Sequence, residues 1–402
     1  MAAAALGMAG TYASFKASSV PFLWSCAVWS LLFMSLGFRA KSSTTRRAVW
    51  INIGVAVLAL GLAEWYWWYM TPEKNNSYCC DETAYFIRND DFGMVAQRNF
   101  TATHVKIINS VPIYKAAYTI DSNGLRIAPP YDVPNGLGSV LFFGCSFTIG
   151  EGVTDEEAMP YVTGLLTHGR YAIYNFGFHG YGPQQMLAAL ERGLTASVVT
   201  VPPKYIIYQA IPYHIERVAG LMTWFPHSPR YRPGDSGRVT AQGNFDTVSD
   251  ETRYSRIERF WRAQGIFGDS VSGTLRKSFL YNALVSPFRS LSIEDVELFL
   301  GIVTQSRDVA AAEYPGAEFH VILWDSMFLR EGFLQFLPPV VDGFRDRQIR
   351  VHLISDIMPD YDGRVSNARY ELHLHDSHPN ALAHRLIAEY VAKEILHEND
   401  TP

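Results

Sequence analysis

Short apolar runs alternate with helical patterns over the second half of this chain of 402 residues. The first run, VLFF at 140–143, has no polar alternation and stops at Gly144, as a strand buried on both faces does. Similar runs follow at 171–177, 204–211, 318–324 and 349–355, with amphipathic stretches between them. Strands that alternate with helices predict a parallel sheet with helices on both faces and right-handed connections. We therefore predict a doubly wound α/β sandwich.

Two longer apolar segments precede this region. Residues 20–38 carry no charge and residues 48–70 carry only Glu64, so each can cross about 30 Å of hydrocarbon as a helix. The link between them has four basic residues and no acid: Arg39, Lys41, Arg46 and Arg47. Because basic loops stay in the cytoplasm, we predict two transmembrane helices in the cytoplasmic (inner) membrane and an extracytoplasmic remainder. A cleaved signal peptide fits less well, since the basic residues follow the apolar segment.

These patterns divide the chain into three parts. Residues 1–70 form the membrane hairpin, 71–138 a polar lead-in subdomain, and 139–402 the sandwich. The lead-in contains an alternating strand pattern that breaks at Asn123-Gly124, a hairpin turn sequence. An insertion at about 216–290 is rich in aromatic residues and arginine, and insertions of this length are typical of lids and binding loops. Carbohydrate binding and a solvated arginine face are the alternatives for it.

The overall charge limits the partners. A formal net charge of −5 and a pI near 6.2 leave no basic surface of the size that nucleic-acid binding requires. The four cysteines, Cys26, Cys79, Cys80 and Cys145, have no spacing that indicates a disulfide framework. We expect no nucleic acid among the partners, and the sequence indicates no cofactor.

A serine stands at the end of the first predicted strand. In sheets of this kind, sites form beyond the carboxyl ends of the strands, and Ser146 follows the 140–143 run by three residues. The neighbouring Gly144, Gly150 and Gly152 allow tight turns, and the helix that follows directs N–H groups back to the turn. Ser146 is a candidate nucleophile. A turn or capping serine is the alternative, whereas a P-loop is excluded because no Gly-Lys-Ser or Gly-Lys-Thr follows.

A candidate base lies near the other end of the sequence, in HLHDSHPNALAHRL. Asp376 and His378 precede the last predicted helix, and residues i and i+2 of an extended loop project to the same side. An imidazole held by a carboxylate is what a serine nucleophile needs as its base. A metal site formed by His373, His375 and His378 is the alternative, although no second ligand cluster accompanies it. His384 is expected on the exposed side of the helix.

Glycines also punctuate the end of the second strand, in NFGFHGYG. They allow the backbone to approach a ligand and to direct an N–H at it. The N–H groups of Ser146 and Gly180 are therefore candidates for an oxyanion hole.

Taken in chain order, these blocks resemble the SGNH (GDSL-type) hydrolase superfamily. The resembling blocks are FFGCSFTIGEGV, NFGFHGYG and DSHPNALAHRL, and the resemblance spans roughly 140–396 with an insertion. It implies a three-layer α/β/α sandwich around a parallel sheet. It also implies Ser146 as nucleophile, His378 as base, Asp376 as the residue that orients it, and Gly180 as an oxyanion donor.

Two departures from the family pattern stand out. One residue separates Asp376 from His378 where the family usually has two, a spacing that resembles the acyltransferase-like branch found in cell-envelope polysaccharide modification. The family's third block supplies an Asn as a further oxyanion donor, but this chain has YQAIPYHIERV there. Gln209, Tyr213 and His214 are the candidate replacements, and we prefer His214. Loss of one such donor typically costs about 10²- to 10³-fold in rate.

The sequence therefore predicts a membrane-anchored serine esterase that acts on an acyl ester, in first place acetyl, in the cell envelope. An O-acetyltransferase that modifies an exported or cell-wall polysaccharide is one alternative. A catalytically degenerate binding or assembly module is another, and a membrane protein of an envelope machine is an expected partner in either case.

Overall fold

The computed structural model describes residues 19–39, 44–70, 77–79, 82–108, 111–129, 133, 136–221, 227–234, 237–246, 278, 280, 291–330, 332–365 and 367–397. By its internal contacts the chain forms two compact units. One comprises 1–74 with 254–290, and the other comprises 75–253 with 291–402. Most of the predicted insertion, including 247–277 and 281–290, lies outside the described residues. The lid and carbohydrate-binding interpretations therefore stay predictions.

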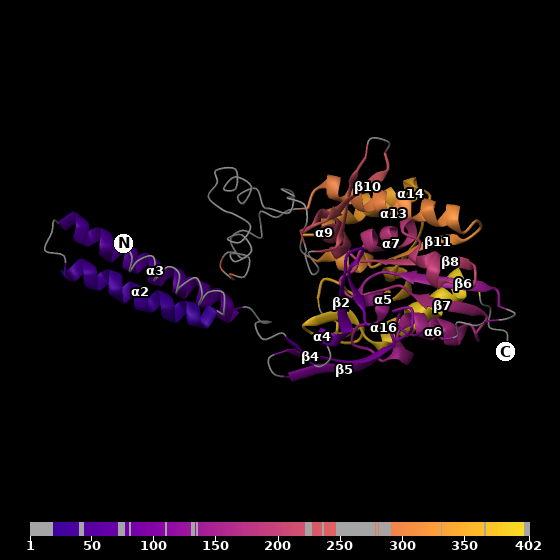
Figure 1. The fold of residues 1–402 in the computed structure, drawn as a ribbon, viewed down its shortest axis with the longest axis horizontal. Coiled ribbons are helices and arrows are strands. Elements are labelled where there is room, and N and C mark those ends of the chain that lie inside the picture. The colour runs from indigo at the N-terminus through magenta and orange to yellow at the C-terminus, as the bar shows by residue number, and fades with distance from the viewer. Residues whose placement is uncertain are drawn as a thin grey trace. The chain divides into compact units, whose positions relative to one another are not determined.

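The first unit contains two long helices, α2 (Ser19–Arg39) and α3 (Thr44–Met70), which pack as an antiparallel pair (Figure 1). Gly54 brings them so close that a Cβ there would lie 2.9 Å from the carbonyl oxygen of Ser30. Phe33 stacks on Trp50 with ring centroids 5.8 Å apart. The segment Arg47–Met70 is long and apolar enough to cross a membrane. In α2 the side chains of Cys26–Leu36 are described, and this part is apolar but by itself shorter than a span. The second membrane span and the side of the membrane stay predictions.

A five-stranded parallel sheet forms the centre of the second unit, in the order β12-β11-β8-β6-β7. Its strands are β6 (Gly138–Phe143), β7 (Tyr171–Asn175), β8 (Pro203–Ala210), β11 (Glu318–Leu323) and β12 (Arg350–Leu353). The chain leaves β6 toward β7 on one side and returns to β8 on the other. The sheet therefore reverses its winding next to β6, which is where α/β folds place their sites.

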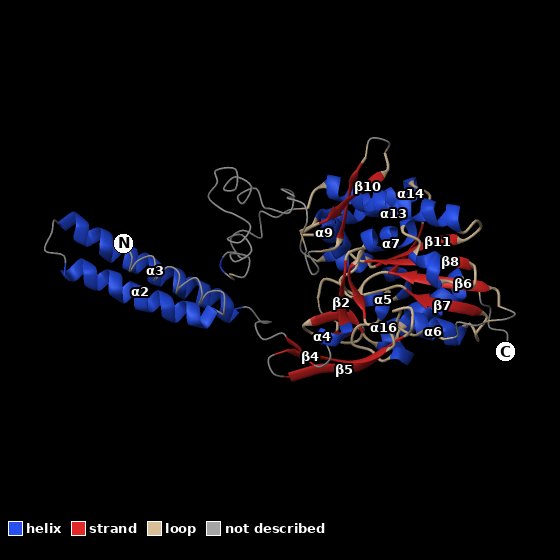
Figure 2. Ribbon diagram, viewed as in Figure 1, coloured by secondary structure: helices blue, strands red, loops and turns tan. Residues whose placement is uncertain are grey.

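Helices cover both faces of this sheet, as Figure 1 and Figure 2 show. One layer contains α7 (Pro183–Glu191), α9 (Tyr213–Ala219), α13 (Ile293–Glu313) and α14 (Leu337–Asp346), and the other contains α6 (Met159–Leu166), α15 (Ile354–Ile357) and α16 (Ala381–Tyr390). Leu141 and Phe143 of β6 pack in the first core, and Val140 and Phe142 pack in the second. Both sets are buried, which explains why the run lacks polar alternation. The predicted α/β/α sandwich is confirmed.

The lead-in residues pack against the sandwich. Strands β1 (Ser77–Cys79), β4 (Phe100–Ile108) and β5 (Val111–Ile120) form an antiparallel sheet, and β2 (Phe86–Asn89) pairs with β3 (Gly93–Ala96). The chain does turn at Asn123-Gly124, but among the described residues Arg126 after the turn makes two isolated bridges, to Ile120 and to Asn175, rather than a strand. A third core joins Tyr85 and Tyr118 of this region to Ile149 and Phe178 of the sandwich. The β4–β5 hairpin thus lies beside the turn that carries Ser146.

Shorter elements complete the described chain. They are α4 (Glu82–Tyr85), α5 (Ser146–Ile149), η1 (Asp155–Glu157), α8 (Leu194–Val198), β9 (Pro229–Pro233), β10 (Val239–Asn244), η4 (Asp325–Leu329), η5 (Leu334–Phe336), β13 (Glu371–His373), β14 (Asp376–Pro379) and η6 (Val391–Ile395).

Candidate active site

Ser146 opens the short helix α5 directly after strand β6, which lies between β8 and β7 in the sheet. Gly144 makes this turn possible, since its φ is +154° and a Cβ there would lie 2.1 Å from Oγ1 of Thr148. Gly150 ends α5 in the left-handed conformation. The turn therefore depends on glycine at both ends, and it places Ser146 at the carboxyl edge of the sheet.

The hydroxyl of Ser146 lies 2.8 Å from Nε2 of His378, although 232 residues separate them. Nδ1 of the same ring lies 2.5 Å from Oδ1 of Asp376. Because an ionised carboxylate only accepts hydrogen bonds, Nδ1 carries the proton and Nε2 is free to accept from the serine. The structure thus brings together Ser146, His378 and Asp376 in one hydrogen-bonded series.

The hairpin β13–β14 holds the acid and the imidazole in place. Asp376 Oδ1 also accepts from the backbone N–H of His378 at 3.0 Å, so the i and i+2 residues are tied to one another. The ring of Phe147 packs on the imidazole with centroids 5.2 Å apart. The His378 side chain keeps 18% of its surface exposed, whereas Ser146 is 6% exposed.

A lysine that the sequence analysis missed reaches the acid of this series. Lys106 of β4 donates from Nζ to Oδ2 of Asp376 at 2.8 Å, and both side chains are buried. Burial acts to raise the pKa of Asp376, but His378 and Lys106 outweigh it and lower that pKa to about 2. The sequence did contain an indication, because His104 and Lys106 occupy alternate positions on the inward face of a strand.

A second carboxylate lies near the imidazole. Glu151, between Gly150 and Gly152, has Oε2 at 3.6 Å from Nε2 of His378 and at 2.7 Å from Nδ1 of His179. Burial acts to lower the pKa of His378, but Glu151 and then Asp376 outweigh it, and the pKa rises above its ordinary value. The sequence analysis missed Glu151 as well. In the sequence, the one sign of a role for Glu151 is that it is the charged residue of the otherwise apolar and glycine-rich block FFGCSFTIGEGV.

The glycine block after β7 lies against α5. Phe178 donates its backbone N–H to the carbonyl of Gly144 at 3.3 Å, and a Cβ on Gly177 would lie 2.7 Å from the backbone nitrogen of Ile149. Gly180 follows in the left-handed conformation, with φ at +69°. These contacts bring the block beside the turn of Ser146, and the role of Gly180 as an oxyanion donor stays a proposal.

The three candidates for the missing Asn lie in different surroundings. His214 is fully buried with Nδ1 at 2.5 Å from Tyr208 Oη, and burial followed by Arg217 lowers its pKa well below the ordinary value. Among the described residues no hydrogen bond joins His214 to Ser146 or to His378. Gln209 accepts from Thr148 Oγ1 at 2.7 Å, and the ring of Tyr213 packs on Phe333.

The metal alternative named His373, His375 and His378. Both ring nitrogens of His378 face Asp376 and Ser146 instead. Glu151, Asp376 and His378 do have ligand atoms within 4.8 Å of one another, but the Lys106 ammonium beside Asp376 disfavours a cation there.

The expected exposure of His384 is wrong. The side chain is fully buried, and Nδ1 lies 3.1 Å from the backbone nitrogen of Met159, so this histidine joins α16 to α6. Burial lowers its pKa to about 3.

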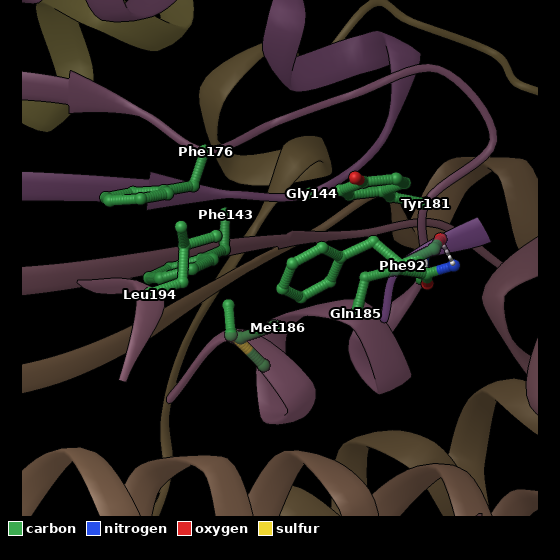
Figure 3. A pocket seen from close by; sticks show the side chains of 10 residues that line it. Phe92, Phe143, Gly144, Phe176, Tyr181, Gln185, Met186 and Leu194 are labelled. Atoms are coloured by element: carbon green, nitrogen blue, oxygen red, sulfur yellow. Dashed lines mark hydrogen bonds between the residues drawn. The ribbon is translucent and has the colours of Figure 1, made fainter. Parts of the chain in front are cut away.

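A small cavity of about 20 Å³ lies on the α7 side of the sheet (Figure 3). It is lined by aromatic and aliphatic side chains and by two glycines, Gly144 and Gly182. Gln185 closes one side, where its amide donates to the carbonyl of Phe92 at 3.4 Å. Ser146 is not among the lining residues, so this cavity is part of the core rather than of the site.

No family model matches the chain, and no curated protein does. Solved structures are similar to it at low identity. A lipolytic protein of the G-D-S-L family from Desulfitobacterium hafniense is 12% identical, with 64% of this chain and 98% of that chain covered and a TM-score of 0.34. An acetyl xylan esterase from the rumen bacterium Butyrivibrio proteoclasticus is 10% identical, with 66% of each chain covered and a TM-score of 0.35. The function proposed below therefore depends on the geometry of the site.

Proposed function

We propose that this protein is a serine esterase or acyltransferase in which Ser146 is the nucleophile, His378 the base and Asp376 the residue that orients it. The observation that carries the proposal is the series Ser146–His378–Asp376 at the carboxyl edge of the sheet, with distances of 2.8 and 2.5 Å. A serine, an imidazole and a carboxylate in this order define a nucleophilic site on any fold.

The chemistry follows from which atoms face one another. Oγ of Ser146 attacks the ester carbonyl carbon while its proton moves to Nε2 of His378. The tetrahedral intermediate expels the alcohol, which takes the proton from Nε2, and an acyl group stays on Oγ. Water or a second alcohol then attacks this acyl-enzyme, gives its proton to Nε2, and releases the acid or a new ester. Serine regains its proton in the last step.

Two features support this cycle electrostatically. Asp376 stays ionised throughout, because His378 and Lys106 overcome the effect of burial and hold its pKa at about 2. The backbone N–H groups of Ser146 and Gly180 are the proposed donors to the anionic intermediate. His214 is bonded to Tyr208 through Nδ1, and its Nε2, which has no partner among the described residues, is the atom that would act as a third donor.

The finer proposal concerns substrate and place. We propose an acyl ester, in first place acetyl, on a cell-envelope polysaccharide, with the apolar segment Arg47–Met70 as part of a membrane anchor. Transfer to a sugar hydroxyl differs from hydrolysis only in the second alcohol. The assembled series of three side chains favours an enzyme over a degenerate binding module.

Covalent labelling by a fluorophosphonate tests the proposal. The full-length protein in detergent is expected to be labelled, and Ser146→Ala and His378→Ala to lose the label. Ser197→Ala removes an exposed serine of α8 and should keep it. A folded but unlabelled wild type would favour the binding module. Acetyl release with and without a polysaccharide acceptor then separates the hydrolase from the transferase.

A further inference from the structure

The imidazole of His378 lies between two carboxylates rather than beside one. Asp376 faces Nδ1 at 2.5 Å, and Oε2 of Glu151 lies 3.6 Å from Nε2, the nitrogen that faces Ser146. Glu151 is only 5% exposed. A buried charge at this distance acts on the protonation of the ring much more strongly than an exposed one.

Three elements hold Glu151 in this position. Tyr114 of β5 donates from Oη to Oε1 at 3.1 Å, and Nδ1 of His179 donates to Oε2 at 2.7 Å. The Tyr114 oxygen in turn accepts from Nδ1 of His104 on β4 at 3.0 Å, since its own proton goes to the carboxylate. These donors favour the ionised form of Glu151. Burial acts against that form, but His378 and His179 outweigh it and lower the pKa of Glu151 well below its ordinary value.

The charges around the ring favour a proton on it. The groups that face His378 and Glu151 come from α4, β4, β5, the segment after β5, the loop after α5, the turn after β7, β14 and α16. They are Tyr85, His104, Lys106, Tyr114, Tyr118, Arg126, Glu151, His179, Asp376 and His384. Burial and then His179 lower the pKa of His104 to about 4, so this ring is neutral near pH 7. Arg126 pairs with Asp155 at 2.7 Å. Lys106 pairs with Asp376, and Glu151 is the second carboxylate beside the imidazole, so a positive charge on His378 is stabilised from both of its nitrogens.

We propose that Glu151 is a positioning residue that stabilises the imidazolium of His378, which forms when the Oγ–H bond of Ser146 breaks and the Nε2–H bond forms. The inference deepens the proposed function and rests on it. Glu151 touches neither the nucleophile nor the carbonyl in this role. It acts through His378, opposite the acid that holds the other nitrogen, and the lead-in hairpin supplies the Tyr114 donor that holds it.

Titration of His378 tests the role of the charge directly. The probe is the carbon-13 resonance of labelled histidine in the full-length protein in detergent micelles, assigned by its loss in His378→Gln. Glu151→Gln keeps the shape and an acceptor oxygen for Tyr114 but removes the charge. We expect the pKa of His378 to fall by about 1 to 3 units in this variant, as for loss of a nearby opposite charge. The acidic limb of kcat/KM for 4-nitrophenyl acetate should move to lower pH by the same amount.

Two further variants make the test specific. Glu156→Gln removes an exposed carboxylate of η1, five residues after Glu151, and should leave the titration unchanged. Glu151→Asp keeps the charge farther from the ring and should lower the pKa less than Glu151→Gln does. It also serves as the test variant if Glu151→Gln fails to fold.

The outcomes separate this inference from the proposed function. If the Glu151 variants lose stability but leave the pKa of His378 unchanged, Glu151 is only a structural residue and the inference is wrong. The titration needs no turnover, so it decides this even if the wild type neither labels nor hydrolyses esters. A folded wild type that neither labels nor hydrolyses esters would overturn the proposed function instead.

Discussion

The buried pair of Lys106 and Asp376 gives the sharpest prediction from the structure. Lys106→Met keeps most of the apolar stem but removes the ammonium that lies 2.8 Å from Oδ2 of Asp376. Relative side-chain exposures are 7% for the lysine and 1% for the aspartate, so water cannot replace the lost partner without a rearrangement. Among the described residues, the Asp376 carboxylate would then keep its bonds to His378 alone.

The size of the effect follows from that geometry. At an effective dielectric constant near 20, two unit charges 2.8 Å apart attract by about 6 kcal/mol, and the cost of desolvation offsets part of this. Removal of one partner from a buried pair typically lowers stability by 3–5 kcal/mol. We expect a value of about 3 kcal/mol, because His378 still compensates the aspartate. Activity should fall by roughly 10- to 100-fold, well short of the roughly 10⁴-fold loss when a triad aspartate becomes asparagine.

Two measurements on the full-length protein in detergent check this prediction. Chemical denaturation followed by tryptophan fluorescence gives the free energy of unfolding, and hydrolysis of 4-nitrophenyl acetate gives kcat/KM. Lys115→Met removes an exposed lysine of β5 and is the matched control, with an expected change within about 0.5 kcal/mol. If Lys106→Met matches this control in both stability and rate, the buried pair does not position Asp376 and the reasoning is refuted.

Three further predictions follow from the site. Only a neutral imidazole accepts the proton of Ser146, so kcat/KM should rise with pH through the pKa of His378. Glu151 and Asp376 raise this pKa above 6.5 despite burial. An acidic limb of the pH–rate profile well below pH 6.5 would contradict this. Arg126→Met removes donors to the carboxylate of Asp155 in η1, to three backbone carbonyls in and beside the loop after α5, and to one carbonyl of β5. It should lower the free energy of unfolding by about 3–5 kcal/mol in chemical denaturation, and an unchanged midpoint would show that the loop holds without it. Gly144→Ala would put a Cβ 2.1 Å from Oγ1 of Thr148, so fluorophosphonate labelling should slow markedly, and labelling at the wild-type rate would show that the turn can adjust.

Much of the fold could be predicted because its information is local. An apolar run without alternation, such as 140–143, indicates a strand buried on both faces, and the amphipathic stretches between such runs indicate covering helices. The order of strands and helices then limits the sheet to a parallel one. Ser146 was found in the same way, because a residue that follows the first strand of such a sheet lies at the edge where sites form.

Other features could not be predicted from local patterns. His384 was expected to be exposed, yet it is fully buried between α16 and α6. A histidine is compatible with either the buried or the exposed face of a helix, because its imidazole can lie in solvent or accept a hydrogen bond from a buried N–H. Whether His384 is buried or exposed depended on Met159, which lies 225 residues earlier in the chain and donates its backbone N–H to the ring.

The sequence by itself determined the layers of the sandwich. It also determined that Ser146 follows the first strand and that Asp376 and His378 lie in the loop before the last helix. Only the tertiary structure decided that Lys106 lies against Asp376, 270 residues away, and that Glu151 lies against His378, 227 residues away. The physical reason is the range of the interactions. Strand and helix patterns arise between near neighbours in sequence, whereas the state of a buried charge depends on whichever groups the folded chain places within a few ångströms of it.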